Sequence, residues 1–189
     1  MKRYLIAILL GMLFALQAQQ NLFERFDAVP CKGYLSSGGA IDLKAGVEKG
    51  ALTARGNKKN FQYIYSYKFP VVAGEKYSVT FNVRTSGNTG LWAMLIFEAE
   101  KGKKAPAPIY VKVGATGNNW NFRIFDFTVP EGAVKASLRF RLAAMPATHQ
   151  VWIDNLRLAP QGKLTMTDFE TAMGFCYALF CNNSDTVTN

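Results

Sequence analysis

The chain has 189 residues, 49% of them hydrophobic, and a formal net charge of +9. This length suffices for one domain with a hydrophobic core. Three cysteines, Cys31, Cys176 and Cys181, are too few for a disulfide scaffold, and their odd number leaves at least one thiol unpaired or paired between chains.

The N-terminus predicts a cleaved signal peptide over residues 1–18. Lys2 and Arg3 provide the positive charge, residues 4–16 are almost entirely apolar, and the small residue Ala18 follows at a plausible cleavage point. A membrane anchor is the alternative, but the apolar stretch is short for a span and glutamines follow it at once. Because no later stretch approaches transmembrane length, we expect a mature protein that is secreted, to the extracellular space or the periplasm.

The mature chain remains basic. Removal of Lys2 and Arg3 lowers the formal charge from +9 to +7, and apart from Lys101, Lys103 and Lys104 the positive residues are scattered. Outside a cell, nucleic acid is not the natural counter-charge. A polyanionic polysaccharide or an anionic cell surface is a better match, and a merely solubilising surface charge is the alternative.

Alternation of apolar and polar residues predicts eight to ten β-strands. Successive side chains of a strand point to opposite faces, so each alternating segment buries one side and wets the other. The pattern is clearest in residues 77–84 and 134–142. No stretch of the mature domain has helical periodicity. In chain order, the predicted strands are 22–27, 40–43, 52–54, 62–69, 77–84, 91–98, 109–113, 121–129, 134–142 and 151–158.

Turn residues separate these short strands, which predicts an all-β fold with antiparallel sheets packed as a sandwich. We place this domain at residues 19–159, followed by a linker and short tail at 160–189. Residues 167–170 echo residues 24–27, which indicates either the opening strand of a truncated second module or a coincidence.

Five segments occur in an order that resembles the jelly-roll carbohydrate-binding modules of families four, nine and twenty-two, which are galactose-binding-domain-like. They are Phe26 with Asp27, residues 49–52, residues 73–77, residues 127–130 and the closing strand 151–156. The match extends over nearly all of the predicted domain. Its N-terminal quarter departs most, because the tryptophan often found after the first strand of these modules is absent.

The resemblance implies a jelly-roll β-sandwich that binds carbohydrate without catalysis, as an accessory to carbohydrate-active enzymes. It also implies a structural calcium ion that ties the first strand to the last. Asp27 and Asp154 would supply carboxylates, and backbone carbonyls near Lys49 and Gly50 would complete an oxygen shell. Glu24 would replace Asp27 if the register differs. The alternative is that Asp154 caps a turn or pairs with an arginine.

Sugar recognition needs exposed aromatic rings beside hydrogen-bonding side chains. Tyr110 is predicted to face outward, and Trp120 lies in a loop beside asparagines. Trp92 lies on a strand that is apolar on both sides, so it is either a platform or buried. The triplet Tyr63, Tyr65 and Tyr67 is predicted to share one face, either as a second platform or as packing. Trp152 is predicted to lie in the core.

Four polar residues complete the predicted ligand site, and alternation directs all of them away from the core. They are Asn82, Arg84, Arg139 and Arg141. Such a row of arginines is either an ordinary solvated surface or a binding site for uronate or sulfate groups. The second alternative is chemically suitable because guanidinium pairs bidentately with these anions.

Catalytic constellations are absent from the sequence. His149 is the single histidine and has no evident partner, and Glu98 and Glu100 are placed as solvated residues rather than as a glycosidase pair. We therefore predict a secreted, non-catalytic module that binds polysaccharide. The alternatives are a structural or adhesion sandwich without sugar binding, and a small polysaccharide lyase or hydrolase.

Overall fold

The computed structural model describes residues 22–36, 38–58 and 62–161. The predicted signal peptide and nearly all of the predicted tail lie outside them. The described residues form ten strands, so the all-β prediction is confirmed. No helix in this part of the chain is long and apolar enough to span a bilayer. The strands are β1 (Leu22–Glu24), β2 (Ala40–Asp42), β3 (Ala51–Arg55), β4 (Gln62–Pro70), β5 (Lys76–Ser86), β6 (Leu91–Ala99), β7 (Ile109–Val113), β8 (Asn121–Thr128), β9 (Ala133–Leu142) and β10 (Gln150–Pro160).

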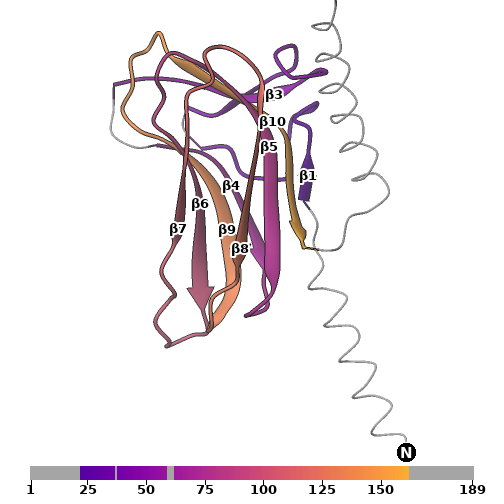
Figure 1. Ribbon diagram of the computed structural model, residues 1–189, viewed down its shortest axis with the longest axis vertical. Helices are drawn as coiled ribbons and strands as arrows, with labels where there is room; N and C mark the ends of the chain where they lie inside the picture. The colour runs from indigo at the N-terminus through magenta and orange to yellow at the C-terminus, as the bar shows by residue number, and fades with distance from the viewer. Residues whose placement is uncertain (1–21, 37, 59–61, 162–189) are drawn as a thin grey trace, which may run out of the picture.

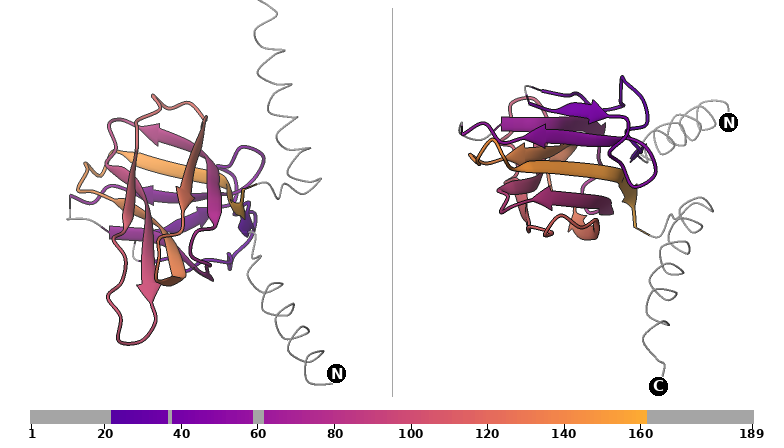
Figure 2. Two further views of the ribbon diagram at one scale, coloured as in Figure 1. Left: turned by 60° about the horizontal axis from the view of Figure 1, so that its bottom comes forward. Right: turned by 90° about the horizontal axis from the view of Figure 1, so that it is seen from above.

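The strands form two antiparallel sheets that pack as a sandwich (Figures 1 and 2). One sheet has the order β2-β3-β10-β5-β8, with β1 also paired to β10, and the other has the order β4-β9-β6-β7. The first predicted strand is shorter than expected. It ends at Glu24, and Phe26 then adopts a left-handed backbone with φ of 54°, which does not continue a strand.

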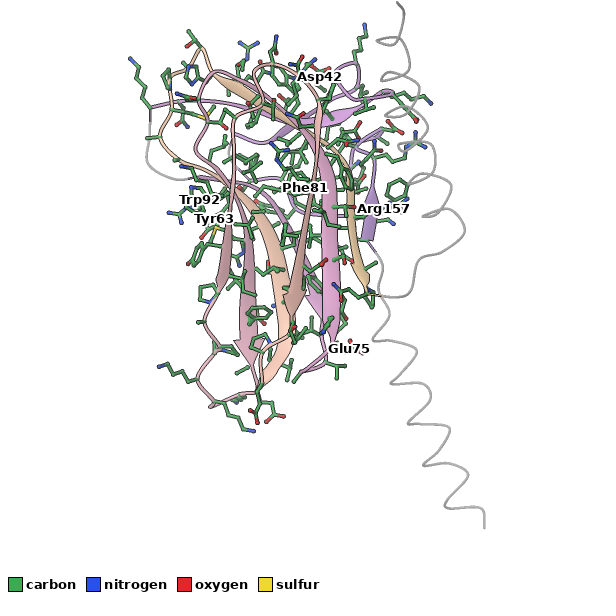
Figure 3. The ribbon with its side chains drawn as sticks, viewed as in Figure 1. Asp42, Tyr63, Glu75, Phe81, Trp92 and Arg157 are labelled. Atoms are coloured by element: carbon green, nitrogen blue, oxygen red, sulfur yellow. The ribbon has the colours of Figure 1, made fainter. Side chains whose placement is uncertain are left out.

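The core lies between the inward faces of the two sheets. Val79 and Phe81 of β5 are fully buried, as are Leu138 and Phe140 of β9. The rings of Phe81 and Phe140 meet edge to face with their centroids 5.0 Å apart, which joins the two sheets. Phe81 accordingly lies in the middle of the molecule (Figure 3). The alternating apolar positions of the sequence therefore become the packed interior.

Strand β10 occupies the centre of the larger sheet. It pairs with β3 and β5 on its two sides and with β1 near its end, so that Leu158 lies opposite Leu22. Its register with β5 shifts between Asp154 and Arg157, and Asn155 there has φ of 49°. This irregularity moves Leu156 into the core while Asp154 remains on the outer side.

A second irregularity corrects the prediction for the tyrosine triplet. The register between β4 and β9 shifts between Tyr63 and Tyr65, so Ile64 is an extra residue in the alternation. Tyr65 is buried and Tyr67 packs against the core, whereas Tyr63 is exposed on the other side. The three tyrosines therefore do not share one face.

We expect Phe81→Ala to lower the free energy of unfolding by about 3–5 kcal/mol, because it removes the ring that contacts Phe140 and leaves a cavity. Urea denaturation would measure the change. Ile124→Thr is the matched control, since Ile124 lies on β8 with 61% of its side chain exposed and should change stability by less than about 1 kcal/mol. Equal effects of the two substitutions would contradict the assignment of the core.

Candidate functional site

The seven residues of the predicted ligand site do not come together on one surface. Trp92, Tyr110, Arg139 and Arg141 lie on the outer side of β6, β7 and β9 in the four-stranded sheet. Asn82, Arg84 and Trp120 lie on or beside β5 and β8, in the other sheet. Alternation predicts whether a side chain points outward, but it does not say which sheet its strand joins. We call the two surfaces the four-stranded face and the six-stranded face.

One row of the four-stranded face crosses all four of its strands. Cross-strand register places Arg141 between Tyr63 and Trp92, with the row continuing from Trp92 to Lys112. Directly opposed side chains on one side of a sheet are close enough to interact. Figure 3 shows Tyr63 and Trp92 together on one flank of the molecule. Trp92 is half-buried, so part of its indole is accessible.

The next row places exposed tyrosines at both ends. Tyr34 pairs with Ser66 through two backbone hydrogen bonds of 2.7 and 2.9 Å, and the row continues through Arg139 and Met94 to Tyr110. Tyr34 is 71% exposed and Tyr110 52%, whereas Met94 between them is only 1% exposed. The row therefore has an exposed aromatic side chain at each end and a buried side chain, Met94, between them. Tyr34 could not be predicted from alternation, because it lies in an isolated bridge and not in a strand.

Two arginines of this face surround the Tyr63 ring. The guanidinium carbon of Arg139 lies 5.1 Å from the ring centroid and that of Arg141 lies 6.0 Å away. Arg139 also donates from Nε to the Ser137 hydroxyl at 3.1 Å, and that hydroxyl is 3.0 Å from the hydroxyl of Ser66. These contacts orient Arg139 and restrict its rotamers.

The four-stranded face is basic. Its described strand positions hold one carboxylate, Glu98, which forms an ion pair with Lys68 at 2.7 Å. Five cationic residues share the face with it: Lys68, Lys112, Lys135, Arg139 and Arg141. An excess of positive charge on one surface attracts anionic ligands.

The six-stranded face differs from its prediction in two ways. Asn82 points outward but is only 2% exposed, because it lies between Asp154 and Phe122 on the neighbouring strands. Trp152, predicted to be a core residue, also lies on this outer side and is half-buried against the guanidinium of Arg84. Core packing in β10 instead comes from the residues on either side of Trp152.

The two carboxylates of the predicted calcium site meet at one loop, residues 46–50. Asp154 is buried, and its two oxygens accept hydrogen bonds from the backbone N–H groups of Val47 at 2.7 Å and Asn155 at 2.6 Å. Asp27 accepts from the N–H of Gly50 at 3.0 Å. The alternative role that we considered for Asp154, capping a turn, therefore occurs in the structure.

Two further oxygen groups of the predicted calcium shell each accept backbone hydrogen bonds. The Lys49 carbonyl accepts the N–H of Gly46 at 2.8 Å, within the same loop. Glu24 accepts from the N–H groups of Phe26 at 3.1 Å and Lys32 at 2.6 Å, so it serves the turn after β1. Among the residues that the structure describes, no three His, Cys, Asp or Glu side chains form a metal-binding group.

The two acidic residues and the histidine that were weighed as catalytic groups each have a partner in the structure. Glu98 pairs with Lys68 and Glu100 with Lys103, each at 2.7 Å, and a hydrogen bond from the lysine lowers the pKa of each carboxyl. A glycosidase acid needs the opposite, a raised pKa. His149 has Nδ1 2.8 Å from the carbonyl oxygen of Asn88, which positions its ring against a loop.

No protein-family model and no curated protein sequence matches this chain. Solved structures do resemble it. The CBM22-1 xylan-binding domain of Paenibacillus barcinonensis Xyn10C has a TM-score of 0.53 and 13% identity, over 76% of this chain and 96% of that domain. A further xylan-binding domain from CBM 22 gives a TM-score of 0.53 and 15% identity, over 76% of this chain and 96% of that one.

The same region also matches the Clostridium thermocellum xylanase 10B fragment that contains CBM22-1 and GH10 modules, with a TM-score of 0.54 and 10% identity. The match covers 76% of this chain but 29% of that one, so the likeness extends over only part of the xylanase fragment. The described residues thus have the jelly-roll sandwich fold of carbohydrate-binding modules, and this prediction from the sequence is confirmed.

The pairing of Glu98 with Lys68 predicts a pH dependence of stability. The pKa of Glu98 is lowered in the folded protein. The ion pair therefore contributes fully to the free energy of unfolding above the ordinary pKa of 4.5, and this contribution is lost as the pH falls through the pKa of the folded state. Both side chains are about half exposed, so Glu98→Gln should cost less than about 1 kcal/mol at pH 7. Urea melts at several pH values would measure the cost, with Glu131→Gln in the exposed turn before β9 as the control. A cost that grows on acidification would contradict the pairing.

Proposed function

We propose that this protein is exported and that its described domain binds polysaccharide without catalysis, through the four-stranded face. The observation that carries the proposal is the double row of aromatic and guanidinium side chains on that face, with exposed Tyr34 and Tyr110 at the two ends of one row. The fold supports it, because the similar solved structures include xylan-binding domains.

The chemistry of this face suits a sugar chain. A pyranose ring has an apolar side that stacks on an aromatic ring and hydroxyl groups at its rim that need donors and acceptors. Tyr110 and the accessible part of Trp92 offer rings from neighbouring strands. Arg139, oriented by Ser137, offers N–H donors beside them. Ligand contacts from several strands of a rigid sheet would hold an extended chain across the face.

Substitution of the end tyrosines tests the proposal. Tyr110→Ala or Tyr34→Ala should weaken polysaccharide binding about tenfold or more, because each removes an exposed aromatic anchor. Leu43→Ala, which removes an exposed apolar side chain from the loop after β2, should leave the affinity unchanged. Glycan-array screening followed by calorimetry would measure this. If no glycan binds to the folded protein, the structural or adhesion alternative is correct. Release of reducing ends or unsaturated products would instead indicate a hydrolase or lyase.

We further propose that the glycan is anionic and carries uronate or sulfate groups. At its described strand positions the face holds five cationic side chains and one carboxylate, Glu98, and an anionic chain would balance this excess of positive charge. Arg139 forms no ion pair within 4.0 Å among the described residues, and a planar guanidinium can hold a carboxylate or sulfate through two parallel hydrogen bonds.

The salt dependence of binding and a matched pair of arginine substitutions test whether the ligand is anionic. Binding of a uronate polymer should weaken as salt screens the face, whereas binding of a neutral xylan should not. Arg139→Gln should lower the affinity for the uronate polymer about tenfold. Arg157→Gln is the control, because Arg157 stacks on Phe23 at 4.5 Å but belongs to the other sheet. Affinity that is independent of salt would contradict an anionic ligand.

We also propose that calcium braces the loop 46–50 to β10, with Asp27, Asp154 and the backbone carbonyl of Lys49 as ligands. The donor set suits a hard cation, because it is made of oxygen atoms only. Burial raises the pKa of Asp154, and the nearby charge of Asp27 raises it further, while Arg25, which pairs with Asp27 at 3.4 Å, acts in the opposite direction. A cation bound between the two carboxylates would add to the compensation that Arg25 provides. Calcium would supply only structural cross-linking.

Thermal melts test the brace. Calcium should raise the melting temperature by several degrees relative to a chelator, since a ligand that binds only the folded state stabilises it. Asp154→Asn should abolish this increment, whereas Asp42→Asn, at an exposed residue that caps the next turn through the Lys44 N–H, should retain it. The quantity to compare is the difference in melting temperature between calcium and chelator for each variant. The melting temperature alone is not sufficient, because Asp154→Asn also weakens the backbone hydrogen bonds that Asp154 accepts. Equal melting temperatures with calcium and with chelator would contradict the proposed calcium site.

A further inference from the structure

The six-stranded face carries a second aromatic and guanidinium cluster, separate from the one described above. The guanidinium carbon of Arg84 lies 4.1 Å from the ring centroid of Trp152 and 5.3 Å from that of Trp120. Arg84 on β5 has Trp152 of β10 as its cross-strand neighbour, and Trp120 immediately precedes β8 on the other side. A guanidinium between two indoles is strongly restricted in orientation. We call these three residues the Arg84 stack.

The loop before β8 is fastened so that Trp120 reaches this position. Thr116 and Thr85 exchange two hydrogen bonds, from the Thr85 N–H at 2.9 Å and from the Thr116 N–H at 2.8 Å. The Asn118 N–H donates to the Thr85 carbonyl at 2.8 Å, and Gly117 and Asn118 take left-handed backbones that turn the chain back into β8. Both threonines are buried. The stack is therefore held in place before any ligand arrives.

Hydrogen-bonding capacity at the Arg84 stack is unused. The buried Nε of Arg84 and the buried Oδ1 of its neighbour Asn82 have no hydrogen-bond partner within the described part of the chain. No described carboxylate lies within 4.0 Å of the Arg84 guanidinium. A buried polar atom without a partner is costly, so a ligand group that reached either atom after a small shift of the covering side chains would relieve that cost. Gln150 and Ser86 add polar groups at the adjacent row.

We propose that the Arg84 stack is a second glycan-binding site, which takes the carboxylate or sulfate of an acidic sugar on the face opposite the first site. The anion would pair with the guanidinium and the sugar ring would stack on an indole. The choice of a glycan as the carrier of the anion rests on the function proposed above. Because the two faces are back to back, one molecule would bridge two polysaccharide chains, and avidity would strengthen its attachment to a polymer network.

The three tryptophans of the chain allow this site to be observed alone. Trp92 belongs to the four-stranded face, so Trp92→Phe leaves Trp120 and Trp152 as the only tryptophans. We expect oligogalacturonate to change the fluorescence of this variant saturably, and a neutral xylo-oligosaccharide of equal length to leave it unchanged. Adding Arg84→Gln should raise the dissociation constant at least about tenfold. Adding Arg157→Gln, the matched arginine on the same face, should change it less than about twofold.

The outcomes separate this site from the first one. If oligogalacturonate leaves the fluorescence of the Trp92→Phe protein unchanged while wild-type protein still binds the polymer through Tyr110, the second site is wrong and the first stands. If the fluorescence responds but Tyr110→Ala has no effect, the first site is wrong and the second stands. If sodium sulfate at the same concentration produces the same fluorescence change, the site binds the anion alone and the proposal of a sugar site is wrong. Should Arg84→Gln unfold the protein, Trp120→Leu, with Trp152 as the reporter, tests the same contact.

Discussion

The structure depends on the alternation of side chains across its strands, together with two places where that alternation is interrupted. Val79 and Phe81 point into the sandwich and their neighbours point out, so one strand contributes to the core and to a surface at the same time. The shift at Ile64 turns Tyr63 outward beside Arg139, and the shift after Asp154 keeps Leu156 in the core. Without these shifts, the four-stranded face would lose a ring and the interior would lose a leucine.

Arginine stacked on an aromatic ring is the feature common to both outer faces. Arg139 and Arg141 lie around Tyr63, Arg84 lies between two indoles, and Arg157 lies over Phe23. This contact covers one of the two faces of the ring and fixes the plane of the cation. The basic net charge of the chain is therefore not merely spread over its surface. A part of it is held in fixed orientations, which favours recognition of planar anions over nonspecific attraction.

Much of this could be predicted from residue patterns. The ten strands, apart from the early end of β1 at Glu24, and the outward direction of Tyr110, Arg139 and Arg141 follow from alternation, segment length and turn residues. Assignment of strands to sheets could not be predicted, because it depends on which distant segments pair, and so Arg84 and Trp120 were grouped with residues of the opposite face. The burial of Asn82 and the exposure of Tyr34 also depend on neighbours across strands. Trp152 was misplaced because a large aromatic residue in an apolar strand resembles core packing until its register is known.

The central place of β10 has a consequence for how the molecule forms. This strand comes last among the ten, yet it separates β3 from β5 and also holds β1. Until its residues are available, the earlier strands of the larger sheet have no partner between them, and contacts between the two ends of the domain must close a very long loop. Such topology delays completion until synthesis has passed residue 160. Under the export that we propose, the chain would have to cross a membrane unfolded, and late completion of this sheet would keep it unfolded for longer.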